Sequence, residues 1–247
     1  MTSTNRSLRT ALLSATAALF LAANGAQAGF TTPSFRGTSG ATYQEWDVFG
    51  DDNTSQAGIQ DSSPEIANQN PNGTATVEET TGKGFRISSG NIYSPTAATA
   101  FDVTIPEADV PQPAHNVTAI VQIKTLGNEL NYDSVHMNGL APAEAATLKD
   151  TALGGFGGND VETWYEFKVP YDEFGDGTPG TENLSLTFEA GDTSTSLDRL
   201  SIDTLISPVS FSGDQPNPNP GTSPIPEPAS LAVLAAGGGL LLRRRRR

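Results

Sequence analysis

Apolar residues recur at every second position through the middle of this chain, and this alternation limits its fold more than any other feature. Within residues 116–124 the apolar side chains fall on one face, as Val117, Ala119, Val121 and Ile123. Residues 161–169 repeat the pattern, with Trp164 on the polar face beside Glu162, Glu166 and Lys168. A period of two places successive side chains on opposite sides of a strand. The pattern therefore predicts half-buried β-strands.

Other segments extend this prediction along the chain. Further strands are expected at residues 43–49, 74–78, 84–88, 99–105, 132–137, 184–188 and 200–206. Turn residues separate them, at Asn72-Gly73, Gly90-Asn91, Asn138-Gly139 and Asp176-Gly177. Only residues 141–150, APAEAATLKD, favour a short helix or helical turn. Because crossover helices for a parallel sheet are lacking, we predict an all-β fold, an antiparallel two-sheet sandwich of the jelly-roll type.

The two ends of the chain differ in composition from this middle. The first 30 residues begin with Arg6 and Arg9, continue with an apolar stretch at 11–23, and reach the small residues Ala26 and Ala28 before Gly29. This order is typical of a secretory signal peptide cleaved by signal peptidase. We therefore expect a signal helix in residues 1–28, cleavage between Ala28 and Gly29, and export of the chain.

The last 22 residues carry three features in a fixed order. Pro226, Glu227 and Pro228 precede the apolar run 229–242, and five arginines follow it: Arg243, Arg244, Arg245, Arg246 and Arg247. As a helix the 14-residue run would be about 21 Å long, against about 30 Å for the hydrocarbon core of a bilayer. The run can serve as a short membrane helix only if the long arginine side chains extend its reach on the cytoplasmic side.

This tail resembles the PEP-CTERM protein-sorting signal, which is also labelled an ice-binding protein C-terminal domain. The resemblance implies a substrate of an exosortase-like processing enzyme, tethered to the inner membrane before processing and then placed at the cell surface, in the outer envelope or outside the cell. It further implies exopolysaccharide or biofilm matrix as the setting. The expected organisation is a signal at 1–28, a β-sandwich at 29–212, a Pro/Asn/Gly linker at 213–225 and the sorting signal at 226–247.

Charge narrows the list of partners. The chain has 14 basic and 28 acidic residues, and the two signal arginines and five terminal arginines leave seven basic residues for the rest, a net charge of about −21. Such a body is repelled by phosphate backbones, so no nucleic-acid partner is expected. There is no cysteine, which excludes disulfides and thiolate metal sites.

Catalysis has little support in the sequence. The two histidines, His115 and His136, lack a metal-ligand spacing, and no Gly-x-Ser-x-Gly, phosphate-loop or His-Glu-x-x-His motif occurs. We therefore predict a non-enzymatic protein. A secreted hydrolase with a spatial pair of carboxylates stays open as an alternative, because 28 acids offer many combinations.

Structural calcium is the one metal that the sequence suggests. Oxygen-rich turns occur at residues 51–53 and 172–177, where Asp and Asn capping their own backbone is the competing interpretation. Residues 197–206, LDRLSIDTLI, resemble the closing strand of jelly-roll carbohydrate-binding modules. That resemblance implies Asp203 as a calcium ligand near Glu45 or Asp47. Asp203 alternates with Ile202, so a solvated carboxylate is the alternative.

Trp164 is the residue that would contact a sugar. An indole on the polar face of a sheet is a platform for a polysaccharide ring, although such a ring also packs under loops. The sequence thus predicts an exported, non-catalytic surface or matrix protein, with a carbohydrate-binding module and a hydrolase as the alternatives.

Overall fold

The regular structure of the described residues consists of twelve β-strands and no helix. The computed structural model describes residues 29–50, 58–65, 70–109, 116–155, 157–170, 180–208 and 210–211. They belong to one compact unit, Ala28–Pro218. No helix in these ranges is long and apolar enough to cross a membrane. The helices expected in residues 1–28 and 229–242 lie outside the described residues.

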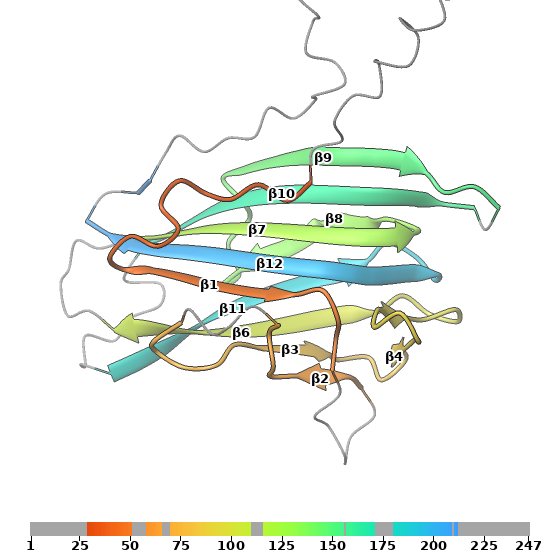
Figure 1. Cartoon of the computed structure of the whole chain (residues 1–247), viewed down its shortest axis with the longest axis horizontal. Helices are drawn as coiled ribbons and strands as arrows, with labels where there is room; N and C mark the ends of the chain where they lie inside the picture. The colour runs from red at the N-terminus through yellow and green to blue at the C-terminus, as the bar shows by residue number, and fades with distance from the viewer. Residues whose placement is uncertain are drawn as a thin grey trace, which may run out of the picture. The chain divides into compact units, whose positions relative to one another are not determined.

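The larger of two sheets has seven antiparallel strands in the order β4-β5-β12-β7-β10-β9, and β1 also pairs with β12 (Figure 1). Its strands are β1 (Ala41–Trp46), β4 (Phe85–Arg86), β5 (Ile92–Tyr93), β7 (Asn116–Gly127), β9 (Glu144–Ala152), β10 (Asn159–Pro170) and β12 (Thr195–Ser207). β5 pairs with the first residues of β12 and β1 with its second half, so both lie on the same side of that strand.

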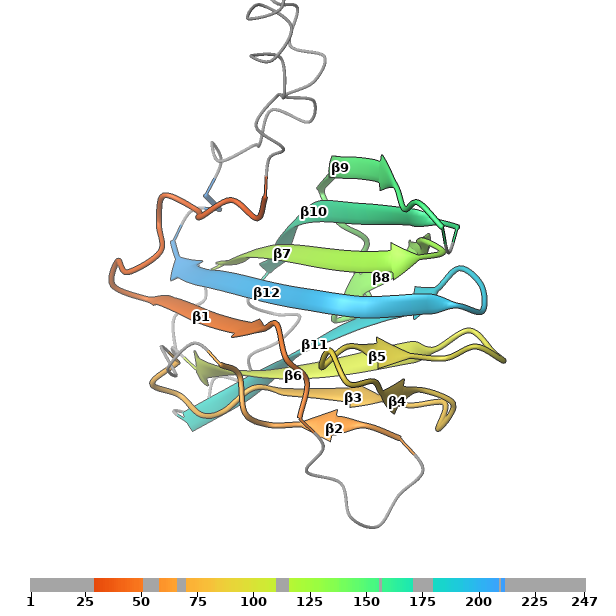
Figure 2. The same ribbon diagram turned by 45° about the vertical axis from the view of Figure 1, so that its right-hand side comes forward.

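The smaller sheet has five antiparallel strands in the order β2-β3-β6-β11-β8. They are β2 (Gln60–Asp61), β3 (Thr76–Glu79), β6 (Ala100–Asp109), β8 (Leu130–Met137) and β11 (Gly180–Ala190). The turned view shows the two sheets as separate layers (Figure 2). The predicted antiparallel two-sheet sandwich is confirmed.

The alternating pattern decides which side chains form the core. Val117, Ala119, Val121 and Ile123 of β7 are all buried in one cluster, together with Leu184, Leu186 and Phe188 of β11 on the facing sheet. Each such aliphatic or aromatic side chain contributes about 1.5–3 kcal/mol when removed from water. Since the chain has no cysteine, no disulfide contributes to its stability and this burial is the main stabilising term.

One predicted element is wrong. Residues 141–150 were expected to favour a helical turn, but Glu144–Ala152 form the edge strand β9, paired with β10. Helix propensity of alanines amounts to a fraction of a kcal/mol per residue, and a strand partner next to the segment outweighs it. The preceding Asn138-Gly139 turn is confirmed, with φ of 50° and 76° and reciprocal backbone hydrogen bonds between Met137 and Leu140.

The outer face of the larger sheet is covered by the start of the described chain. Residues 29–36, which we call the covering segment, run across this face before the chain enters β1 (Figure 1). The backbone N–H of Thr31 donates to Gln122 Oε1 at 2.6 Å, and Gln122 Nε2 donates to the carbonyl of Thr31 at 2.8 Å. The glutamine of β7 thereby pairs with the segment as a neighbouring strand would.

Candidate functional site

The predicted sorting and cleavage residues lie almost entirely outside the described part of the chain. This holds for Ala26, Ala28, Pro226–Pro228 and Arg243–Arg247, and for the oxygen-rich turns 51–53 and 172–177. Gly29 is described and exposed, at the start of the covering segment. The processing predictions remain predictions.

Asp203 is buried beside an arginine. Its side chain, with no exposed surface, accepts two hydrogen bonds from Arg36, from Nε to Oδ1 at 2.5 Å and from Nη2 to Oδ2 at 2.7 Å. The Arg36 guanidinium also lies 3.4 Å from the ring centroid of Tyr43, the residue that faces Asp203 on β1. Burial raises the pKa of Asp203 to about 6, although Arg36 acts to lower it.

These contacts give the calcium prediction no support among the described residues. Asp47 lies beyond the end of β1, is exposed, and donates its backbone N–H to Glu65 Oε2 at 3.0 Å rather than approaching Asp203. Glu45 lies near enough to Asp203 for its charge to raise the pKa of that carboxyl, as the predicted proximity requires, but Glu45 itself pairs with Arg199, whose Nε donates to Oε1 at 2.6 Å. Within the described ranges no three His, Asp or Glu side chains converge to hold a metal ion. The guanidinium groups of Arg36 and Arg199 pair with Asp203 and Glu45, where the resemblance implied a calcium ion. The alternative, a solvated Asp203, is excluded because its carboxylate is buried.

Trp164 does lie on the face that alternation predicted, but its ring is covered. Its side chain is 2% exposed and packs in a second cluster with Phe35, Ile120, Leu148 and Leu205. Phe35 comes from the covering segment, and its ring meets Phe211 edge-on with 5.2 Å between centroids. The interpretation of Trp164 as an open platform for sugar is therefore wrong in this structure.

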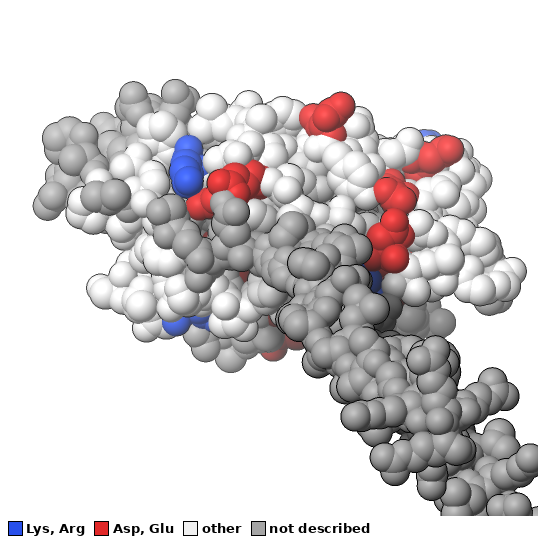
Figure 3. Space-filling view, turned by 90° about the horizontal axis from the view of Figure 1, so that it is seen from above, with Lys and Arg blue, Asp and Glu red and all other residues white. Residues whose placement is uncertain are grey.

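Charges on this outer face neutralise one another. The five ion pairs among the described residues are Arg36–Asp203, Lys124–Asp198, Lys149–Asp160, Lys168–Glu166 and Arg199–Glu45. They use five of the seven basic residues that lie between the signal and the terminal arginines. The rest of the domain is left acidic, and from the β9 side acidic groups are scattered over a mostly uncharged surface (Figure 3). Nothing on this face favours an anionic ligand.

Glu107 is the acid most changed by its surroundings. It is fully buried in β6, where the hydroxyls of Thr42 and Thr204 donate to its Oε1 at 3.0 and 2.5 Å, and its Oε2 has no partner among the described residues. Burial raises its pKa to about 7. A carboxyl that is still partly protonated at neutral pH suits a general acid, but this one is enclosed between the sheets and has no contact with solvent. It is a structural group.

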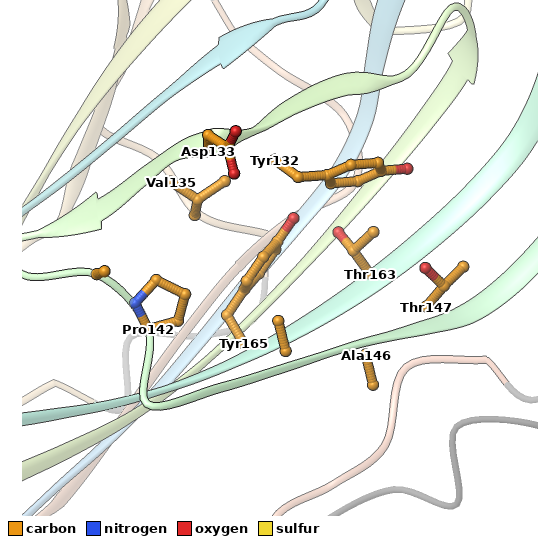
Figure 4. Close-up of a pocket in the computed structure, with 10 residues that line it drawn as sticks. Tyr132, Asp133, Val135, Pro142, Ala146, Thr147, Thr163 and Tyr165 are labelled. Atoms are coloured by element: carbon orange, nitrogen blue, oxygen red, sulfur yellow. The ribbon is translucent and has the colours of Figure 1, made fainter.

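The structure also contains a site that sequence analysis missed. A cleft of about 440 Å³ opens at the edge of the sandwich between β8 and the pair β9–β10, lined by Tyr132, Asp133, Thr163, Tyr165 and small apolar residues (Figure 4). Alternation assigns Tyr165 to the core and says nothing of the opposite sheet edge. The sequence signal for this cleft is the adjacent pair Tyr132 and Asp133. Both side chains lie on one edge strand and are able to contact a ligand.

Comparison with known proteins gives little to set beside this geometry. No family model matches the chain, and no curated protein matches it. Among solved structures, the enzymatically active domain of tailspike protein 4 from bacteriophage CBA120 is similar at 12% identity, with a TM-score of 0.20. The match covers 73% of this chain and spans about a fifth, 21%, of the tailspike chain.

Proposed function

We propose that this chain is an exported, non-catalytic protein of the cell surface or extracellular matrix that an exosortase-like enzyme processes at its tail. The observation that carries the proposal is the order of Pro226-Glu227-Pro228, the apolar run 229–242 and the five terminal arginines. Each part has a separate physical role: a cleavage motif, a stretch too short to span a bilayer comfortably, and a charge cluster that stays in the cytoplasm.

The described domain is compatible with this role. It is a β-sandwich with a core of its own, acidic overall, and the linker at 213–225 is rich in proline and asparagine. Such a linker is extended and solvated, which would keep a folded domain away from the membrane and leave the motif accessible. The finer features of the proposal are a jelly-roll connection of the strands, a cleaved signal helix and a short membrane helix at 229–242.

The test is the intact mass of the full chain recovered from a Gram-negative host with and without an exosortase-like enzyme. We expect loss of residues 1–28 in both hosts and loss of the tail near Pro226–Pro228 only where the enzyme is present. Glu227→Ala should retain the tail, whereas Pro224→Ala, two residues before the motif, should be processed as the unaltered chain is. A tail that stays intact beside an active enzyme, or is lost equally without it, would refute the proposal.

Sugar binding is the second candidate function, and it needs a surface other than the one first predicted. Trp164 is covered and the Asp203 region holds an arginine, so neither the sheet-face platform nor the structural calcium supports it. The open cleft beside Tyr165 is the remaining place for such an activity.

A further inference from the structure

The cleft between β8, β9 and β10 exists because both edge strands leave regular pairing beside it. In β8 the register with β11 shifts between Thr187 and Glu189, and there the N–H of Glu189 donates to the Ser134 hydroxyl at 2.8 Å instead of to a backbone carbonyl. In β9 the register with β10 shifts between Glu162 and Thr163, and the extra residue, Leu148, packs on the outer face. Irregularities of this kind are common at sheet edges and next to functional sites.

One polar atom of the cleft has no partner. The side chain of Tyr165 is 2% exposed, and its buried hydroxyl makes no hydrogen bond within the described residues. The neighbouring hydroxyl of Thr163 donates to the carbonyl of Ile123 at 3.2 Å, and its oxygen lies close enough to the Tyr165 phenol to lower the pKa of Tyr165. Burial raises the pKa of Tyr165 to about 12, so the phenol keeps its proton and is a donor at neutral pH.

Tyr165 differs in this from the other described tyrosines, although the buried hydroxyls of Ser196 and Ser201 also lack a hydrogen bond among the described residues. The hydroxyl of Tyr43 donates to Glu45, that of Tyr93 to Ser194 at 3.5 Å, and that of Tyr132 to Glu129 at 2.5 Å. A buried hydroxyl without a partner is costly and calls for an explanation. A ligand group that enters from the adjoining cleft is one, and because the hydroxyl oxygen is buried, the side chains beside it must shift for that contact to form.

The walls of the cleft indicate the class of that group. Tyr132 is 40% exposed, and Figure 4 shows Tyr132 and Asp133 on one wall of the cleft, with the Tyr165 side chain pointing toward them from the opposite wall. Pro142, Ala145 and Ala146 add apolar surface, and Thr147 and Thr163 add hydroxyls. Aromatic rings with a few hydroxyls and one carboxylate suit a ligand that has an apolar face and an edge of hydroxyl groups.

We propose that this cleft binds a neutral pyranose ring of a polysaccharide. The sugar ring packs against the aromatic ring of Tyr132. The Tyr165 hydroxyl donates to a sugar oxygen, and the Asp133 carboxylate accepts hydrogen bonds from sugar hydroxyls. The 440 Å³ volume lies within the range of about 300–1,000 Å³ usual for small-ligand sites. Uronate polymers are disfavoured, because Asp133 and the acidic domain repel them. The proposal concerns the sandwich alone, so it stands or falls independently of tail processing.

The experiment measures binding of the purified full chain to soluble glycans by affinity electrophoresis and calorimetry. The probes are laminarin, dextran and galactomannan as neutral polymers, with alginate as the anionic one. We expect at least one neutral polymer to bind, with a dissociation constant on the order of 1 mM or below per site, and alginate not to bind.

Variants connect the binding to the cleft. Tyr132→Ala should weaken it about tenfold and Tyr165→Phe about fivefold, because the first removes the ring contact and the second only the donor. The melting temperature of Tyr165→Phe should not fall, which separates a lost ligand contact from a damaged fold. Phe85→Ala is the matched control: Phe85 is 47% exposed on β4, and its removal should leave binding unchanged.

Three results would overturn the proposal. They are no binding of any neutral polymer by the unaltered chain, unchanged binding in both tyrosine variants, and preferential binding of alginate.

Discussion

Trp164 and Tyr165 are neighbours in β10, yet they face opposite sides of the sheet and meet opposite conditions. Trp164 lies under the covering segment and Phe211, beside polar groups that are largely paired. Tyr165 faces between the sheets toward an edge that two register shifts hold open, and its hydroxyl is unpaired among the described residues. Alternation correctly gives the face of each side chain. Whether a face is open depends on what another part of the chain places over it.

Removing the covered ring should have the largest effect on stability. Trp164→Ala leaves a cavity under the covering segment, and we expect it to lower the free energy of unfolding by about 5 kcal/mol. Urea denaturation monitored by circular dichroism measures this. Tyr132→Ala, at the open cleft, should change stability by less than about 1 kcal/mol. Equal losses in the two variants would mean that the two regions do not differ as described.

The Arg36–Asp203 pair tests how firmly the covering segment is held. Arg36→Met leaves a buried carboxylate without its partner, and we expect a loss of about 4 kcal/mol at pH 7. Adding Asp203→Asn should restore part of it, since the uncompensated charge is then gone. Arg86→Met, at a residue exposed on β4, is the control. If the double variant were as unstable as the sum of the two single changes, the pair would not be coupled.

Stability should decrease as the pH rises toward neutrality. Burial raises the pKa of Glu107 from its ordinary 4.5 to about 7 and the pKa of Asp203 from its ordinary 3.8 to about 6. Between the ordinary and the raised value, each carboxyl keeps its proton in the folded state and releases it in the unfolded state. Unfolding then releases protons, and rising pH favours it.

For Glu107 alone the change amounts to about 3 kcal/mol from pH 4.5 to 7. Melting temperatures across this range measure it, and Glu107→Gln should flatten the slope. Glu182→Gln, at an acid of the neighbouring strand β11, should leave the slope as it is. Stability that instead rises with pH would show that these groups are not buried in the way described.

The smallest change is expected at the open cleft. Tyr165→Phe removes a buried hydroxyl that makes no hydrogen bond within the described ranges, so the free energy of unfolding should stay the same or increase by up to about 1 kcal/mol. Thr163→Val, which removes a hydroxyl that donates to Ile123, should lower stability by about 1 kcal/mol. A marked loss of stability in Tyr165→Phe would show that the hydroxyl makes a structural hydrogen bond. Tyr165 would then be a structural residue, as Trp164 is.

Local patterns predicted much of the fold and little of the site. The alternation in residues 116–124 and 161–169 identified the strands and faces of β7 and β10, and Asn138-Gly139 identified the turn that follows β8. The edge strand β9 was missed because its alanines favour helix locally, and the two-residue strands β2, β4 and β5 are too short to show a period.

The contacts that define the candidate sites join distant positions. Arg36 pairs with Asp203 across 167 residues, and Thr31 reaches Gln122 across 91. No periodicity within a strand reports such a contact. The cleft depends on register shifts in two edge strands from different sheets, and a shift of one residue leaves no mark on local composition. The pairing of Asp203 with Arg36 was missed for the same reason, since Arg36 lies outside the strand whose pattern drew attention to Asp203.

The position of β12 has a mechanical consequence. It is the last strand of the fold, and it lies between β7 on one side and β1 and β5 on the other, antiparallel to all three. A load entering at Ser207 pulls β12 along its own axis, so the hydrogen bonds on both flanks resist together in shear instead of opening one at a time. Traction from the carboxyl-terminal side therefore acts first on the long pairings of β12 with β7 and β1.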